Sequence, residues 1–164
     1  MNYLKLLTII AFLSVFSISF AQSKVGHIDF QSVLSQMPEF KEAQAQVQKL
    51  EKTYQVELEA SQKELQTKLQ TYEADVQNQT EVTNAARAKE IQGMQKNIQD
   101  YIQMVQQDLQ KKNQDMLIPI VEKLRNAISE VAKELGLNYV MDAGSLLHKD
   151  GQDLEKEVKI KLGF

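Results

Sequence analysis

Cysteine is absent from this chain of 164 residues, and proline, glycine and histidine are scarce. Without a thiol there is no disulfide bond, no cysteine nucleophile and no lipidated cysteine, and cysteine usage gives no indication of the redox compartment. The formal net charge of -3 also disfavours the strongly basic surface that nucleic-acid binding requires. The composition is that of one modest domain with a mildly acidic balance.

The two histidines, His27 and His148, each lie beside a strand-like run and are far apart in the sequence. Histidines in such runs are more often structural residues than metal ligands. Carboxylates are plentiful, but they have lysine partners four residues further on, as solvated helix faces do. Examples are Glu59 with Lys63 and Glu64 with Lys68. Glycine-rich phosphate loops, nucleophile elbows and metal-ligand spacings are all missing. We therefore expect no enzyme activity, no catalytic or metal-binding residue and no cofactor.

The compartment is indicated by residues 1–21. Lys5 precedes an apolar run at 6–20, which is followed by Ala21. The small residues Ser19 and Ala21 match a secretory signal peptide that is cleaved after Ala21, so the mature chain is expected to be exported and to lose one positive charge. An uncleaved membrane anchor is the alternative, although the run is short for a helix that spans a bilayer.

The longest pattern covers residues 39–117, which contain no proline and one glycine, Gly93. Gln, Lys and Glu fill its polar positions, and helices tolerate or favour all three. Its apolar residues recur at steps of three, four or a multiple of these. Val47, Leu58 and Leu69 are eleven residues apart, a spacing of about 3.67 residues per turn that gives a nearly straight apolar seam. The pattern predicts two long amphipathic helices.

The apolar positions in the two halves of this stretch mirror each other, as they should if the chain reverses. The reversal is expected within 77–83, where Asn, Gln and Thr compete with helix formation, and Thr83 is the expected N-cap of the returning helix. We therefore predict an antiparallel hairpin. Its predicted seam includes Leu50, Tyr54, Leu65, Leu69, Ile91, Met94, Val105 and Leu109. A continuous parallel coiled coil is the alternative interpretation.

Strand-like segments lie towards both ends of the mature chain, at 24–30, 138–142 and 145–149. A lone N-terminal strand needs the C-terminal strands beside it, so the feet of the hairpin must come together. Three strands make a small core with open sheet edges, which oligomerisation would close. The predicted fold is α+β and mostly α, with a hairpin arm at 39–117. A β body formed by homo-oligomerisation is assigned to 22–38 and 118–164.

Short helices are expected to flank these strands at 31–37 and 154–162, and Asp153 is the expected cap of the second. Pro38 suits the first turn of the long helix. Pro119 should kink the returning helix without ending it, because the apolar period continues beyond it.

Several segments occur in a distinctive order. Val25-Gly26-His27-Ile28-Asp29-Phe30 and Met37-Pro38-Glu39 stand near the start of the mature chain, and Ile118-Pro119-Ile120 and Tyr139-Val140-Met141-Asp142 stand near its end. Their order and spacing across nearly the whole mature chain resemble the OmpH/Skp family of periplasmic chaperones.

The resemblance implies a trimer in which strands of three subunits form a central barrel and three hairpins surround a cavity. In that family the cavity holds unfolded outer-membrane β-barrel proteins on their way to the outer membrane, without ATP. The expected partners are thus unfolded outer-membrane proteins and copies of this chain, with transient contact to a membrane surface and no nucleic acid. Residues expected in the oligomer body are Val25, Ile28, Phe30, Tyr139, Val140 and Met141.

A holdase needs many weak contacts so that its client is both shielded and released. The candidates are apolar residues off the seam, namely Val56, Ala60, Ala74 and Met104, and the alternative is that they are scattered surface residues. Residues 39–117 contain ten Lys or Arg against thirteen Asp or Glu, whereas the best-known member of the family has strongly basic arms. The arm therefore offers weak long-range attraction to acidic clients, apart from a positive spot at Arg87 and Lys89.

Two other functions are weighed against the chaperone. An exported structural spacer or envelope assembly factor would use the same coiled-coil arm to bind one fixed partner. A hairpin that lies on a membrane surface ranks third, because the arm lacks the basic polar face that such helices carry.

Overall fold

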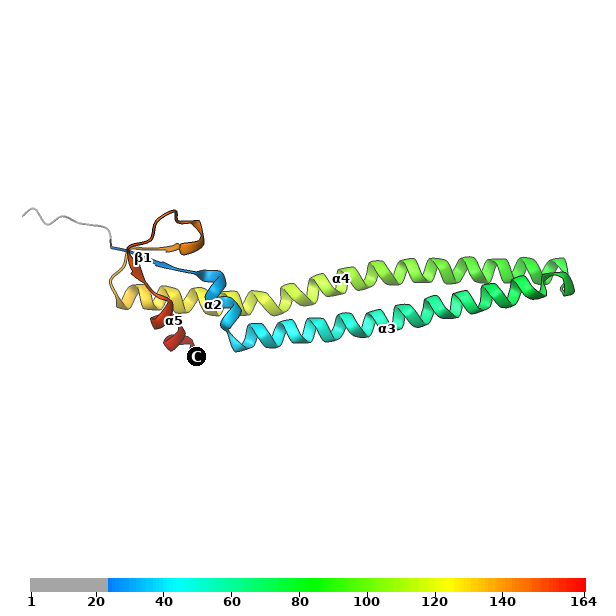
Figure 1. Cartoon of the computed structure of the whole chain (residues 1–164), viewed down its shortest axis with the longest axis horizontal. Coiled ribbons are helices and arrows are strands. Elements are labelled where there is room, and N and C mark those ends of the chain that lie inside the picture. Colours follow the sequence, from blue (N-terminus) through cyan, green and yellow to red (C-terminus); the bar gives the residue numbers. More distant parts are fainter. Residues whose placement is uncertain (1–23) are drawn as a thin grey trace, which may run out of the picture.

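The computed structural model describes residues 24–164, so the expected signal peptide lies outside the described part. A small body carries a long arm of two helices that run side by side (Figure 1). The arm consists of α3 (Pro38–Asp75) and most of α4 (Glu81–Glu134). The 38 residues of α3 extend about 57 Å at about 1.5 Å per residue. The predicted hairpin and the mostly helical α+β fold are confirmed, and the continuous parallel coiled coil is excluded.

The chain reverses through a short 3₁₀ helix, Val76–Asn78, followed by extended backbone at Thr80. The Thr80 hydroxyl accepts a hydrogen bond from the Thr83 backbone N–H at 3.2 Å, so Thr80 is the N-cap of α4. The predicted cap, Thr83, is wrong because it already lies in the first turn and donates to the true cap. The Asn84 side chain also donates to the Val76 carbonyl oxygen at 3.0 Å and closes the tip.

The foot of the arm follows the local signals in the sequence. The short helix α2 (Phe30–Gln36) is capped by Asp29, whose carboxylate accepts from the Ser32 backbone N–H at 2.8 Å. Pro38 occupies the start of α3, where its missing N–H has no intrahelical partner to lose. The second helix of the arm, α4, continues through Pro119 and ends before Gly136, whose φ of 64° is left-handed. Among the described helices, none combines the length and apolarity that crossing a membrane requires.

The body contains a small parallel sheet in which β1 (Val25–Ile28) lies between β2 (Tyr139–Asp142) and β3 (Gln152–Asp153). The strand predicted at 145–149 is wrong. Because β2 and β3 pair with opposite edges of β1, the chain after β2 must cross the sheet before it can pair again. Residues 143–151 form this crossing, and the third strand begins only at Gln152.

Gly26 sits at the centre of the sheet, opposite Val140 on one side and Gln152 on the other. A Cβ atom at this position would lie 2.4 Å from Leu154 Cδ1 and 2.8 Å from Leu137 Cδ1. It would also lie 3.2 Å from the Gln152 carbonyl oxygen. The absent side chain therefore lets the C-terminal segment pack directly on the strand.

The hydrophobic core lies between the sheet, the foot of the arm and α5 (Glu155–Leu162). Its most buried large side chains are Val33, Met37, Leu124, Leu154 and Val158. The C-terminal helix is also tied to α4 by Lys161, whose ammonium group lies 2.8 Å from Glu134 and 2.9 Å from Glu130. These two carboxylates raise the pKa of Lys161 to about 12.

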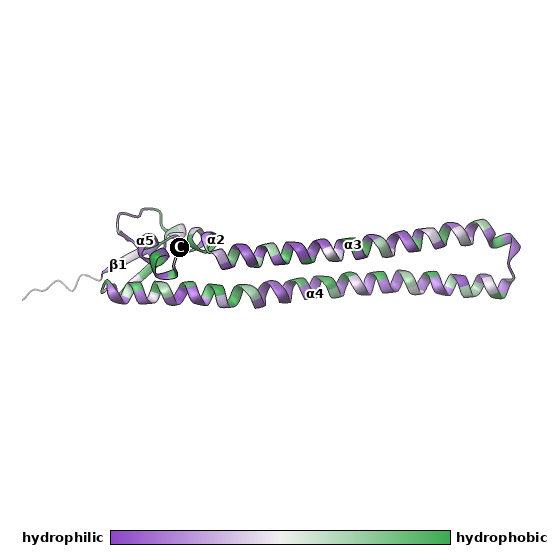
Figure 2. Ribbon diagram, turned by 90° about the horizontal axis from the view of Figure 1, so that it is seen from below, coloured by the Kyte–Doolittle hydropathy of each residue, from purple (hydrophilic) through white to green (hydrophobic). Residues whose placement is uncertain are grey.

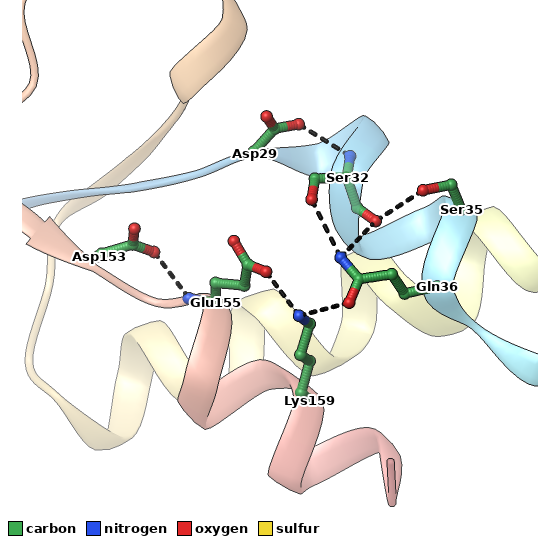
Figure 3. A network of polar contacts seen from close by, with 7 residues as sticks. All are labelled: Asp29, Ser32, Ser35, Gln36, Asp153, Glu155 and Lys159. Atoms are coloured by element: carbon green, nitrogen blue, oxygen red, sulfur yellow. Dashed lines mark hydrogen bonds and ion pairs between the residues drawn. The ribbon is translucent and has the colours of Figure 1, made fainter.

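A polar network joins α2 to α5 on the same side of the body (Figure 3). Lys159 Nζ donates to Gln36 Oε1 at 2.7 Å and to Glu155 Oε1 at 2.5 Å, and Gln36 Nε2 in turn donates to the Ser32 carbonyl oxygen at 3.1 Å. Asp153 accepts from the Glu155 backbone N–H at 2.9 Å. The N-cap residue of α5 is Leu154 and not the predicted Asp153, but the Asp153 side chain still accepts from the first backbone N–H of the helix.

Candidate functional site

The middle of the arm is held together by tyrosines that reach carboxylates on the opposite helix. The Tyr54 hydroxyl donates to Asp108 at 2.7 Å, and the Tyr101 hydroxyl donates to Glu57. The two rings meet edge to face, with centroids 6.2 Å apart. The hydrogen bond to Glu57 raises the pKa of Tyr101 to about 12, since ionising the phenol would place two negative charges together.

A second group of polar contacts lies nearer the tip. Tyr72 donates to Glu90 at 2.6 Å, and Lys68 pairs with the same carboxylate. Lys68 and Tyr72 together hold the pKa of Glu90 below its usual value. Beyond them, Arg87 Nη2 donates to Asp75 at 3.1 Å, which lowers the pKa of Asp75. The arm therefore has an apolar seam edged by hydrogen-bonded and charged pairs.

The residues predicted for the seam all lie in half-buried or buried positions, and Ile91 is the most buried of them at 9% exposure. Apolar and polar residues alternate along both helices (Figure 2). Two helices packed on each other bury only one stripe of each, so most of the arm surface faces solvent. Such a surface is open to a partner along its whole length.

The four residues proposed to contact clients are exposed. The exposed fractions of Val56 and Met104 are 57% and 47%, and Ala60 and Ala74 are exposed as well. Two further apolar residues near the tip are exposed although they are not among these four candidates, namely Val76 at 43% and Val82 at 80%. Their sequence signal is an apolar side chain within an otherwise polar turn.

Five of the six residues predicted for the oligomer body lie in the sheet, and the sixth, Phe30, begins α2. Val25, Tyr139 and Met141 share the outward face and are 41%, 64% and 47% exposed. On the inward side, Ile28 is 2% exposed, while Phe30 and Val140 are half-buried beside α4. One face of the sheet thus carries large apolar side chains that are exposed to solvent.

The histidines remain apart in the fold. His27 is buried within β1 at 6% exposure, with Nε2 3.7 Å from an Asp153 carboxylate oxygen, whereas His148 is exposed in the crossing segment. Within residues 24–164, no cluster of three or more His, Asp or Glu side chains has the geometry to hold a metal ion.

Comparison with known proteins agrees with this geometry. Residues 24–162 match the family model described as "Outer membrane protein (OmpH-like)". The chain belongs to the OmpH-like family. The match covers the body and the arm together, and this membership supports a chaperone role and is consistent with a protein that is not an enzyme.

Two members illustrate the breadth of the family. The chain is 22% identical over 148 residues to the chaperone protein Skp of Yersinia enterocolitica, covering 87% of this chain and 90% of that protein. A crystal structure of an OmpH-like outer membrane chaperone from Caulobacter crescentus superimposes with a TM-score of 0.77 at 15% identity. That superposition covers 87% of this chain and 85% of the other and establishes the shared fold.

Proposed function

We propose that the protein is an ATP-independent periplasmic holdase. It binds unfolded outer-membrane β-barrel proteins and keeps them from aggregating on the way to the outer membrane. The observation that carries the proposal is the long arm with apolar side chains left in solvent, such as Val56 at 57% and Met104 at 47% exposure. Many shallow contacts of this kind hold an unfolded chain and still release it without nucleotide.

The holdase is proposed to act as a homotrimer built through the body, residues 22–38 and 118–164, with residues 39–117 as its arm. Support comes from the outward sheet face, where Val25, Tyr139 and Met141 are exposed beside two sheet edges. Burying these side chains against other copies stabilises the assembly by about 25 cal/mol per Å² of apolar surface. Three arms on one body would enclose a client from several sides.

The periplasm is the proposed location. The signal-peptide pattern at residues 1–21 would direct the chain to export, with cleavage after Ala21. Family membership supports the same compartment. We further propose that contact with a membrane surface is transient, because the slightly acidic arm offers little attraction to anionic lipids.

A dilution assay tests the proposal. A urea-unfolded outer-membrane β-barrel protein is diluted into buffer with and without the protein, and light scattering is followed in the absence of nucleotide. We expect suppression near one oligomer per client and no binding to the folded client. Unchanged scattering with several clients and at several salt concentrations would contradict the proposal and favour a spacer with one fixed partner.

A pair of variants shows whether the arm is the surface responsible. Val56→Gln combined with Met104→Gln should weaken suppression, because both exposed apolar contacts are replaced by polar groups. Ile160→Gln is the matched control, since Ile160 is 68% exposed but lies in α5 of the body. Equal suppression by the wild type, the double variant and Ile160→Gln would show that Val56 and Met104 do not contribute to client binding.

A further inference from the structure

A groove near the tip of the arm differs from the rest of the hairpin surface. It has a volume of about 460 Å³ and lies between α3 and α4. We call it the tip groove. The side chains that define it are Leu69, Tyr72, Val76, Arg87, Ala88 and Ile91. Of these side chains, all but Arg87 present apolar carbon to the groove, and the polar residues Glu73, Asn84 and Gln92 complete its lining. The apolar part of the lining favours an apolar group.

Arg87 gives this groove a polar function as well. Its guanidinium lies 4.6 Å from the centroid of the Tyr72 ring, and its Nη2 donates to Asp75 at 3.1 Å. Its Nη1 is buried and has no hydrogen-bond partner, the only buried side-chain polar atom in this condition among the described residues. A buried donor without an acceptor is unfavourable, so an acceptor brought to this end of the groove would be stabilised.

The charged residues around the groove favour a neutral hydrogen-bond acceptor for Arg87 over an anionic one. Asp75 already pairs with Arg87, and Glu73 lines the groove. An anionic ligand would therefore meet a carboxylate without finding a free positive charge. A neutral carbonyl oxygen beside an apolar side chain fits better. Extended polypeptide offers a backbone carbonyl at every residue and an apolar side chain at many of them, and in an unfolded chain these carbonyl groups are not paired with other backbone.

We propose that the tip groove binds one extended segment of an unfolded polypeptide. An aliphatic side chain of the segment enters between Leu69, Val76 and Ile91, and a neighbouring backbone carbonyl accepts a hydrogen bond from Arg87 after a small turn of its guanidinium. The inference rests on the proposed holdase function and adds a defined contact to it. Because the groove contacts only one apolar side chain and the backbone, it does not discriminate among clients by the rest of their sequence.

Two alanines at the start of α4 provide a matched test. Ala85 and Ala88 are both exposed and one turn apart, but only Ala88 lines the groove. Ala88→Gln fills the groove with a polar side chain, whereas Ala85→Gln leaves it open, and glutamine suits a helix at both positions. The affinity for a urea-unfolded outer-membrane β-barrel protein is measured for both variants. We expect Ala88→Gln to weaken it about tenfold, the effect of leaving one aliphatic side chain in water, with Ala85→Gln unchanged.

Methyl NMR of the whole mature protein, without the signal peptide, tests whether the client contacts the tip groove. On addition of the unfolded client, the methyl signals of Leu69, Val76 and Ile91 should shift in the wild type and stay in place in Ala88→Gln. Client binding that leaves these signals unmoved would overturn the proposed binding at the tip groove but not the proposed holdase function. Absence of client binding would overturn both. Shifts that depend on protein concentration without client would show that a second copy fills the groove, which also overturns the inference.

Discussion

Replacing Gly26 by alanine tests whether close contact between the central strand and the C-terminal segment organises the body. The new Cβ would lie 2.4 Å from Leu154 Cδ1 and 2.8 Å from Leu137 Cδ1. Leu154 is fully buried, so its side chain lies against other core residues. The backbone carbonyl of Gln152, 3.2 Å away, can yield only if β3 shifts. Overpacking of this kind costs about 1–3 kcal/mol.

Hydrogen exchange measures the loss of stability in the body, where the substitution lies. Amides in β1 and β2 should exchange about 5- to 150-fold faster in Gly26→Ala if they open through unfolding of the body, since about 1.4 kcal/mol is a factor of ten. The tip of the arm, which does not contact this site, should exchange as in the wild type. The two regions are read from separate peptides in the same experiment.

Gly93→Ala is the control for this experiment. Gly93 lies within α4, and an added Cβ there would meet no atom within 4 Å. The change should stabilise the helix by about 1 kcal/mol, because alanine loses less backbone entropy than glycine. Equal exchange of β1 in Gly26→Ala and the wild type would refute the argument that the bare backbone at this position is required for packing.

Three further predictions follow from the core and the arm. Leu124→Ala should lower the free energy of unfolding by about 2–5 kcal/mol, measured by urea denaturation, because the side chain is fully buried; a loss below about 1 kcal/mol would contradict the core assignment. Leu65→Cys with Met94→Cys should crosslink within one chain, and crosslinking of position 65 between chains instead would contradict the hairpin. The pKa of Tyr101 is raised to about 12, so its contact with Glu57 should stabilise the arm fully below about pH 10 and lose this effect as the pH rises to about 12. Glu57→Gln should bring the phenol titration, followed by ultraviolet absorbance, back towards its usual range, and an unchanged titration would show that this contact does not form.

The arm could be predicted from the sequence because its signals are local and repeated. The apolar period of Leu50, Leu65 and Leu69 and its mirror in α4 specify two helices and their antiparallel order. The cap was misplaced because Thr80 and Thr83 are equally good capping residues three positions apart. The choice between them depends on where the backbone becomes extended, and that is decided by the tip as a whole.

The third strand could not be placed because its partner lies far away in the sequence. Residues 145–149 carry apolar side chains that suggest a strand, yet Leu147 is fully exposed and the segment crosses the sheet. Gln152 and Asp153 form the strand despite being polar, because they pair with β1 beside the bare backbone of Gly26. The tip groove could not be predicted from the sequence either, because Leu69 and Arg87 belong to different helices and come together only in the fold.

Native mass spectrometry of the protein mixed with an unfolded outer-membrane β-barrel protein shows whether the oligomer holds a client. The protein is presented with the client on dilution from urea, without nucleotide, and the mass of each soluble species is measured. We expect a species containing three copies of the chain and one client. Soluble protein that never carries the client, beside client lost to aggregation, would contradict this expectation.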